Sequence, residues 1–302
     1  MSFAGSLILT AIGSAYYKVS RDQVFRPLPL STKSAMQNLP GLYQQQVFKI
    51  ARRAAQLSAV LIDDIVGGNA FSYPFKGIYE LYSNFRSYSA SATALFSIYL
   101  IMYTVISMVY WATITPVYTA LFIFAGPIGI AVAWIHSLLH ANMLTMMFLR
   151  VSHLNENLVV SCIKVNGYQS LFKSRPIRYT VSHRKTYFWA FYLPKKVAEY
   201  SVAITSLLLL LGVSGIPLLG PYIFHLLSAP VLSRIYFSKI LRLKGLDNIQ
   251  RFDNIFEHPG QYTAFGITAG FIDTIPLIAG ISLSTNILGA TLLGIDEHII
   301  TR

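Results

Sequence analysis

The residues best suited to chemistry include two histidines in an apolar stretch. His136 and His140 are four residues apart, so they share one face of a helix. Two such histidines can bind a metal ion, but no carboxylate lies in this stretch and only His153 is close along the chain. We therefore expect neither a metal site nor a cofactor. The alternative is that both side chains form hydrogen bonds between helices or with Asn142.

Asp273 is the one charged residue between Gln261 and Ile295. An ionisable side chain inside an apolar segment is a functional hypothesis by default, here a proton relay or the binding of a cation-coupled substrate. The alternative is that Asp273 caps the turn at Pro276 or lies at the depth of the lipid headgroups.

Basic and aromatic residues alternate from Lys173 to Lys196, with no acid among them. Such a pattern can stack on nucleic-acid bases, or it can anchor a membrane interface through lipid phosphates. The apolar composition favours the membrane, and we expect no nucleic-acid partner. The predicted contacts with lipid headgroups or anions are Arg86, Lys173, Arg175, Arg178, Arg184 and Lys185.

Motifs of enzymes are missing from the sequence. There is no set of nucleophile, histidine and acid, no P-loop and no dinucleotide fingerprint, and Gly67-Gly68 lacks the spacing that cradles a phosphate. We therefore expect a protein without catalytic activity.

The composition points to a membrane protein. Hydrophobic residues make up 54% of the 302 residues and charged residues 12%, whereas soluble domains average about 25% charged residues. The net charge is +12, yet Ser87 to Leu149 contains no Asp, Glu, Lys or Arg. A single cysteine, Cys162, excludes an intramolecular disulfide.

Three apolar blocks cover 87–149, 201–233 and 261–295, and each contains a Pro or Gly break. A helix needs about 20 residues to cross the hydrocarbon core, so the first block is long enough for two spans. The turn at Gly215 to Pro221 leaves arms of roughly 14 and 12 residues in the second block, which is too short for two spans. That block is either one kinked helix or a hairpin that enters and leaves by one face, and the third block poses the same choice.

The flanking charges favour hairpins. Every segment between the blocks is basic, and basic loops prefer the cytoplasmic side. If each block is a hairpin, the opposite side receives only short uncharged turns, so a lipid-droplet monolayer is an allowed location beside a bilayer. Exposed backbone in lipid is costly, so the hairpins should pack on each other or on other subunits of a homo-oligomer.

The first 86 residues form a separate region of the prediction. Residues 1–17 are apolar, and their positive charges follow at Lys18 and Arg21, which favours a short membrane-associated helix over a signal peptide. Gln44 to Ile65 reads as a basic amphipathic helix that ends at Gly67-Gly68. This helix either packs on the protein or lies in the headgroup layer. The helical membrane domain then covers 87–302.

Several motifs together resemble the etoposide-induced protein 2.4 / CysZ superfamily. The C-terminal block has Phe265-Gly266, then Pro276 after nine residues, then Ser284-Thr285-Asn286-Ile287-Leu288-Gly289-Ala290. The segments Tyr73-Pro74-Phe75-Lys76-Gly77 and Ile216-Pro217-Leu218-Leu219-Gly220-Pro221 agree with it, so the resemblance covers roughly 70–297.

This resemblance implies an all-α integral membrane fold that mixes transmembrane helices with hemi-penetrating hairpins. The fungal branch matches best through the Tyr73 segment and Asp296-Glu297, which implies a multi-pass protein of the endoplasmic reticulum and lipid droplets linked to the spore wall or to lipid handling. A sulfate-like anion transporter is an alternative, although Ser83-Asn84-Phe85-Arg86 lacks the glycine of the bacterial anion motif. An adaptor in membrane trafficking or autophagy is the other alternative.

Overall fold

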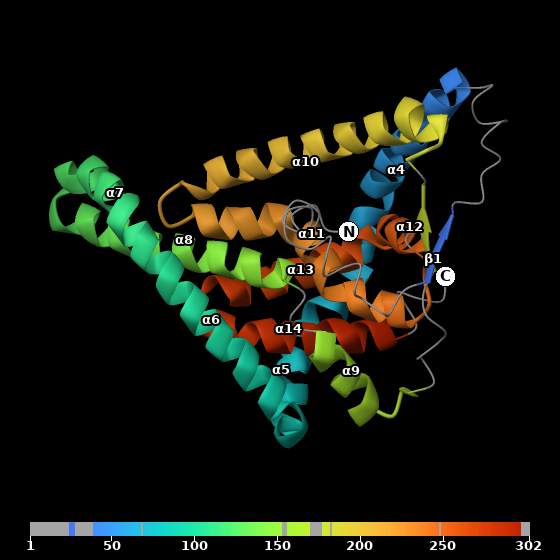
Figure 1. Ribbon diagram of the computed structural model, residues 1–302. Helices are drawn as coiled ribbons and strands as arrows, with labels where there is room; N and C mark the ends of the chain where they lie inside the picture. The colour runs from blue at the N-terminus through green and yellow to red at the C-terminus, as the bar shows by residue number, and fades with distance from the viewer. Residues whose placement is uncertain are drawn as a thin grey trace.

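The protein is built from helices, as a computed structural model shows (Figure 1). The structure describes residues 24–27, 39–67, 69–152, 156–169, 177–181, 183–247 and 249–296. One short parallel ribbon pairs β1 (Val24–Pro27) with β2 (Ile177–Thr180). The all-α prediction is therefore confirmed, with this ribbon as a small addition. The predicted helix in 1–17 lies outside the described residues.

The first apolar block folds into three helices with both predicted breaks in use. α6 (Phe85–Thr113) stops one residue before α7 (Thr115–Phe122), because Pro116 has no N–H for a continuing helix. The short 3₁₀-helix η3 (Ile123–Ala125) leads to Gly126, whose φ of 68° reverses the chain. α8 (Gly126–Val151) then returns along α6 and α7.

The second block forms two helices that lie side by side. α10 (Leu193–Ser214) continues the π-helix η5 (Phe188–Tyr192), and α11 (Gly220–Leu243) packs against it. The predicted arms of roughly 14 and 12 residues are shorter than the two helices, which have 22 and 24 residues. The difference arises because both helices continue beyond the apolar block into polar sequence. The hydrophobic block therefore marks only the part of each helix that is apolar enough for lipid.

The third block forms a shorter helix pair. α13 (Pro259–Thr274) and α14 (Ile278–Ile295) flank a turn at residues 275–277. Pro276 is followed by Leu277 at φ 67°, and in the second block Pro217 is followed by Leu218 at φ 61°. Both tight turns thus use a Pro-Leu pair, with the left-handed conformation placed on leucine.

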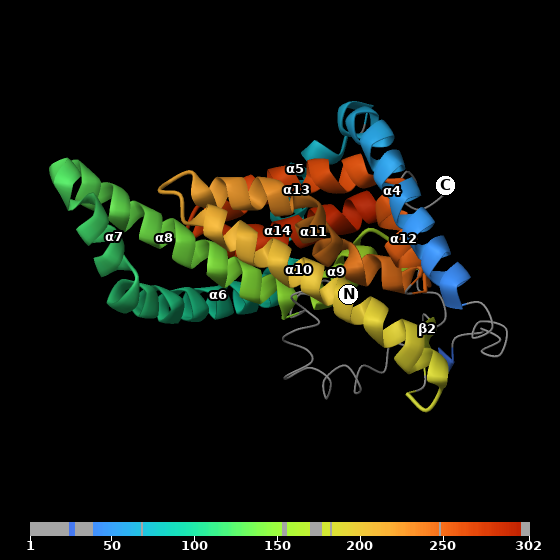
Figure 2. The ribbon, with the colours of Figure 1, turned by 90° about the horizontal axis from the view of Figure 1, so that it is seen from above.

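The remaining helices pack around these pairs. They are α4 (Leu39–Gly67), the 3₁₀-helix η2 (Asn69–Ser72), α5 (Tyr73–Ser83), α9 (Glu156–Val165) and α12 (Gln250–Glu257). α4 contains the predicted amphipathic segment and crosses the end of the bundle where α12 and the start of α10 also lie (Figure 2).

α14 is the centre of the protein. It contacts α5, α6, α8, α9, α11 and α13, and side chains such as Leu283 and Ile287 are fully enclosed. Two glycines allow α5 to approach closely: a Cβ on Gly77 would collide with the Thr285 carbonyl, and one on Gly289 with the Tyr73 carbonyl. The two sequence segments Tyr73–Gly77 and Ser284–Ala290 are therefore partners in one helix crossing.

Within the described residues, four helical stretches are long and apolar enough to cross a membrane, namely Phe85–Thr113, Thr115–Arg150, Phe188–Ser214 and Ile278–Ile295. In α14, 83% of the apolar stretch is buried in the protein, against 6–11% in the other three. The outer helices therefore present their apolar side chains outward, while α14 is enclosed by protein.

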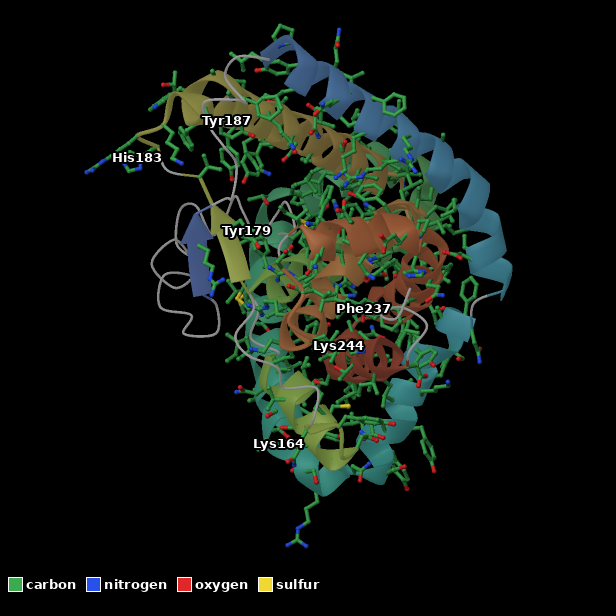
Figure 3. The ribbon with its side chains drawn as sticks, turned by 90° about the vertical axis from the view of Figure 1, so that its right-hand side faces the viewer. Lys164, Tyr179, His183, Tyr187, Phe237 and Lys244 are labelled. Carbon is green, nitrogen blue, oxygen red and sulfur yellow. The ribbon has the colours of Figure 1, made fainter. Side chains whose placement is uncertain are left out.

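The turns and the basic segments lie at opposite ends of the molecule. The reversals after α7, α10 and α13 all point toward one end in Figure 1, while β1, β2 and α12 lie at the other. A view onto this second end shows Lys164, His183 and Lys244, which come from three separate segments (Figure 3). We call this second end, which carries Lys164 and Lys244, the basic end.

Candidate functional site

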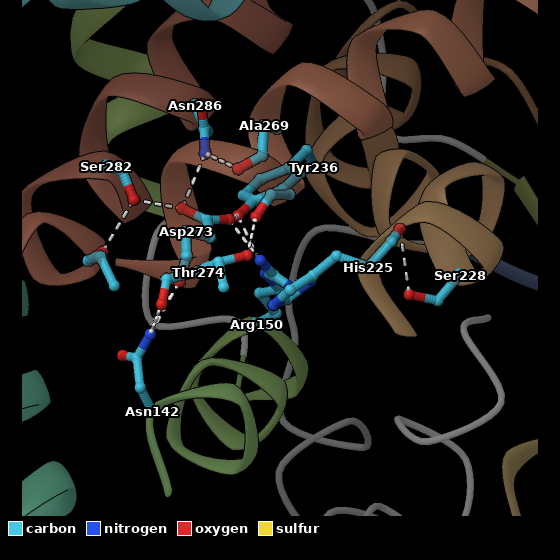
Figure 4. A network of polar contacts seen from close by, with 12 residues as sticks. Asn142, Arg150, His225, Ser228, Tyr236, Ala269, Asp273, Thr274, Ser282 and Asn286 are labelled. Carbon is cyan, nitrogen blue, oxygen red and sulfur yellow. Dashed lines mark hydrogen bonds and ion pairs between the residues drawn. The ribbon is translucent and has the colours of Figure 1, made fainter. Parts of the chain in front are cut away.

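Asp273 lies at the centre of a buried polar network (Figure 4). One carboxylate oxygen accepts hydrogen bonds from the Arg150 guanidinium and from Tyr236 Oη, the latter at 2.9 Å. The other accepts from Ser282 Oγ and from Asn286 Nδ2, at 2.9 Å for the amide. Since α8, α11, α13 and α14 each supply a member, the carboxylate joins four helices.

The Arg150–Asp273 ion pair is fully enclosed. Neither side chain is more than 1% exposed. A buried carboxylate without a partner costs several kcal/mol, and the guanidinium with three further hydrogen bonds supplies the compensation. Arg150 Nε also donates to Tyr236 Oη at 3.0 Å, so the tyrosine bridges both charges.

Asn142 fastens this network to the turn between α13 and α14. Its Nδ2 donates to the backbone carbonyls of Asp273 (2.9 Å) and Thr274 (3.0 Å), the carbonyls that α13 leaves open at its end. Its Oδ1 accepts a hydrogen bond from Tyr99 Oη at 2.8 Å. Tyr99 Oη in turn accepts a hydrogen bond from the Leu277 backbone amide. The turn is therefore capped by α6 and α8, and the Asp273 side chain does not itself cap the turn.

His225 stands beside the ion pair. Its ring interacts electrostatically with Arg150, and its side chain packs over Gly270, where an added Cβ would lie 3.0 Å from the His225 Cβ. Within the described part of the chain neither ring nitrogen has a hydrogen-bond partner, and neither does Arg150 Nη1. The network is thus complete around Asp273 but open on its arginine side.

The histidine pair forms contacts between helices. His140 is hydrogen-bonded to Tyr110 Oη of α6 and, at 2.9 Å, to Ser214 Oγ of α10. His136 stacks on it with ring centroids 5.4 Å apart, and its nitrogens have no partner in the described residues. Asn142 is not a partner of either histidine. In the parts of the chain that are described, no three His, Cys, Asp or Glu side chains gather in a metal-binding arrangement.

The predicted headgroup contacts do not form one site. Arg86 is exposed in the first turn of α6, whereas Arg184 and Lys185 are exposed just before η5, on another side of the molecule. Arg178 lies in β2. Lys173 and Arg175 lie outside the described residues. The role of all six in binding lipid stays a prediction.

A second buried cluster surrounds Glu80 of α5. Its Oε1 accepts from Tyr88 Oη at 2.6 Å, Asn166 Nδ2 at 3.0 Å and Asn84 Nδ2 at 3.2 Å. Asn166 also touches Cys162 of α9, which is fully buried. Burial and the nearby Glu80 carboxylate raise the pKa of the Cys162 thiol to about 12. This cysteine is therefore a packing residue rather than a nucleophile.

Arg150 is the functional residue that sequence reasoning missed. It directly follows the charge-free stretch Ser87 to Leu149, so the sequence alone assigns it to the basic segment after the first block. Its position at the end of α8 was the available signal, because a cation on the last turn of an apolar helix can still face inward. Its partner is 123 residues away, and no local pattern connects them.

The fold and its network define a class: an all-helical membrane protein whose outer helices expose apolar side chains and whose buried ion pair joins the inner helices. Over 301 residues the chain is 42% identical to outer spore wall protein LDS1 of Saccharomyces cerevisiae, covering 99% of the chain and 93% of that protein. The chain belongs to this family of outer spore wall proteins.

A second relative is more distant. Outer spore wall protein RRT8 of Saccharomyces cerevisiae is 25% identical over 247 residues, which cover 76% of the chain and 72% of that protein. No model of a known protein family matches the chain. No solved structure matches it either. The wider resemblance to the etoposide-induced protein 2.4 / CysZ superfamily therefore stays a prediction.

Proposed function

We propose that this protein acts in assembly of the outer spore wall as a non-enzymatic, multi-pass protein of endoplasmic reticulum and lipid-droplet membranes. The observation that carries the proposal is the 42% identity to outer spore wall protein LDS1 over nearly the whole of both chains. Identity spread over 99% of the chain includes the membrane helices and the basic end together, so the relative supports a role for the whole molecule.

The placement of charge supports insertion from one face. The turns at 114–126, 215–219 and 275–277 contain no Asp, Glu, Lys or Arg, whereas the segments that connect the three blocks are basic. Basic segments remain on the cytoplasmic side, and uncharged turns can enter hydrocarbon with little cost in charge desolvation. Helix pairs that carry no polar domain at their far end suit a droplet monolayer as well as a bilayer.

Complementation tests the proposal. We would express the chain in Saccharomyces cerevisiae lacking both outer spore wall proteins LDS1 and RRT8, and measure outer wall integrity by entry of a small dye into spores. Restored exclusion of the dye is the expected result. A fluorescent fusion followed against droplet and reticulum markers during sporulation tests the location. Normal abundance without rescue would contradict the spore-wall role, and exclusion from both membranes would contradict the location.

Anion transport and a trafficking adaptor are the alternatives. The enclosed Arg150 is balanced by Asp273, so the network holds no surplus positive charge with which to attract a sulfate-like anion. Sulfate uptake by proteoliposomes, lost in Arg86→Ala, would favour the transporter. Co-purification of autophagy proteins with the chain would favour the adaptor.

A further inference from the structure

A cluster of cations from three helices converges at the basic end, where α4, α10, α11 and α12 meet. We call it the cationic junction, and its members are Lys49, Arg53, Lys195, Lys196 and Arg234. Asp253 of α12 binds Arg53 and, at 3.5 Å, Lys49. Glu199 of α10 binds Lys196 at 2.5 Å and Lys195 at 3.8 Å. Four of the five cations therefore pair directly with two carboxylates, and Arg234 is the fifth.

The cations influence one another across the junction. Lys195 is repelled by Lys49 and Arg53 of α4 as well as by its neighbour Lys196. Arg234 of α11 is attracted by Glu199. Glu257 of α12 acts on Tyr262, and even with this third carboxylate the five cations of the junction are in surplus. This convergence could not be predicted from the sequence, because its members come from segments far apart in the chain.

The junction is partly buried, so its surplus positive charge is costly in free energy unless an anion binds there. The Arg53 side chain is 15% exposed and that of Lys195 29% exposed, so water only partly solvates the surplus charge. Arg53 stacks on Phe252 and Phe256, with its guanidinium carbon 5.0 and 4.8 Å from the ring centroids, and Arg234 stacks on Phe252 at 5.0 Å. The rings hold both guanidinium planes in place without neutralising them.

The guanidinium of Arg234 has N–H donors without a hydrogen-bond partner among the described residues. Among the described residues it makes no hydrogen bond and no ion pair; it contacts the Phe252 ring and interacts electrostatically with Tyr262 and Glu199. A guanidinium carries five N–H donors in a planar fork that fits phosphate oxygens. A fixed guanidinium with open donors, beside ammonium groups in surplus, is an arrangement suited to a phosphate.

The position of the junction indicates which phosphate it meets. Lys195 and Lys196 follow directly after η5, whose Trp189 is exposed, and precede the exposed apolar residues Val197 and Val202 of α10. Aromatic residues next to the start of an apolar span are typical of the membrane–water interface. The cations therefore lie at the level of lipid headgroups.

We propose that the cationic junction binds the phosphate of an anionic phospholipid, with Arg234 and Arg53 as planar donors and Lys49 and Lys195 as point charges. The assignment rests on the membrane location proposed above. It deepens that proposal by naming a lipid class, phospholipids with an exposed phosphate such as phosphatidic acid, and a site distinct from the predicted residues Arg86, Arg184 and Lys185.

Binding to the purified full-length protein in detergent tests the site. Dioctanoyl phosphatidic acid, dioctanoyl phosphatidylcholine and inorganic phosphate would be titrated separately and the dissociation constants compared. We expect phosphatidic acid to bind tightest, and Arg234→Gln or Lys195→Gln to weaken it about tenfold or more, because each removes a charged hydrogen-bond donor. Lys164→Gln removes one exposed charge from α9 and should leave the affinity unchanged.

Further variants separate the site from a folding defect. Arg234→Lys keeps the charge and should retain more affinity than Arg234→Gln, while gel filtration checks that every variant stays folded. Equal affinity of wild type and Arg234→Gln for phosphatidic acid would overturn the site, and equal affinity for inorganic phosphate and phosphatidic acid would overturn the lipid assignment. The measurement uses purified protein, so a chain that failed to reach droplets or reticulum in cells would contradict only the proposed function.

Discussion

At the scale of single residues, the interior is held by polar groups in a protein whose composition is mostly apolar. Asp273 has four side-chain donors around it, and each comes from a helix other than α13. Hydrophobic contacts among helices that also face lipid discriminate poorly between alternative packings, because lipid tails are as apolar as the side chains. A charge that finds its partners in one arrangement only can select that arrangement.

The Asp273 carboxylate is therefore expected to be essential for stability. Asp273→Asn leaves the Arg150 guanidinium buried without a counter-charge, which should lower the free energy of unfolding by about 3–5 kcal/mol. Thermal unfolding in detergent, followed by gel filtration, measures the loss. In Asp273→Leu combined with Arg150→Met the cost should be smaller than the sum of the two single costs, because neither charge is left alone. Additive costs would contradict a coupled pair. Wild-type function in a normally abundant Asp273→Asn protein would exclude a proton relay.

Cys162 offers a second test at this scale. Its pKa of about 12 leaves very little thiolate at neutral pH, since the thiol loses its proton only far above it, and the side chain is fully enclosed. Iodoacetamide at pH 7.5 should therefore leave the folded protein unmodified and alkylate it fully after denaturation. Intact mass measures both states. Rapid alkylation of the folded protein would show that α9 does not pack against Glu80 as described here.

At the scale of helices, local sequence predicts where elements begin and end but not what they touch. Pro116, Gly126 and the Pro276 turn all mark real helix boundaries, because backbone geometry is decided by neighbouring residues. Gly280, by contrast, lies in the first turn of α14, where Tyr99 and Phe96 leave no room for a Cβ. A glycine can serve flexibility or close approach, and only the packing partner distinguishes the two.

The crossing of α5 over α14 depends on close approach. In Gly77→Ala, the new methyl group would meet the Thr285 carbonyl and the Gly289 amide, both backbone atoms that cannot turn away. Overpacking of this kind typically costs about 1–3 kcal/mol, which exceeds the gain in helix propensity. Gly212→Ala in α10 is the matched control, because its Cβ would meet nothing within 4 Å. The same unfolding assay should show a lower melting temperature for Gly77→Ala and an equal or higher one for Gly212→Ala. Equal melting temperatures for the two variants would contradict the tight crossing.

At the scale of the whole molecule, the distribution of charge could be predicted from the sequence, whereas the pairings inside it could not. The charge-free blocks and the basic segments between them can be read directly from the sequence, and the basic end of the structure follows from them. Arg150 to Asp273 and Arg53 to Asp253 join residues 123 and 200 positions apart. Such pairs arise from how the helices pack, which a single sequence does not encode as a local pattern.

The depth of the three turns distinguishes hairpins from full spans. We would replace Cys162 by serine and introduce one cysteine at a time as His183→Cys, Phe124→Cys, Leu219→Cys and Leu277→Cys, then label microsomes with a membrane-impermeant maleimide. His183→Cys at the basic end should react in sealed vesicles. Phe124→Cys, at the exposed apex of α6 to α8, should react only after the vesicles are opened, because α6 with 29 residues and α8 with 26 residues are each long enough to span.

Leu219→Cys and Leu277→Cys decide the second and third helix pairs. α13 has 16 residues and reaches only about 24 Å, less than the hydrocarbon core, so its turn should end within lipid. The turn after α10 packs against α7 through Tyr118, whose Oη donates to the Gly215 carbonyl at 2.9 Å, and is held below the apex of the first pair. Both cysteines should therefore resist the reagent in sealed and opened vesicles and react once detergent dissolves the membrane. Reaction of Leu219→Cys on opening alone would make the second pair two full spans and leave the first and third as described.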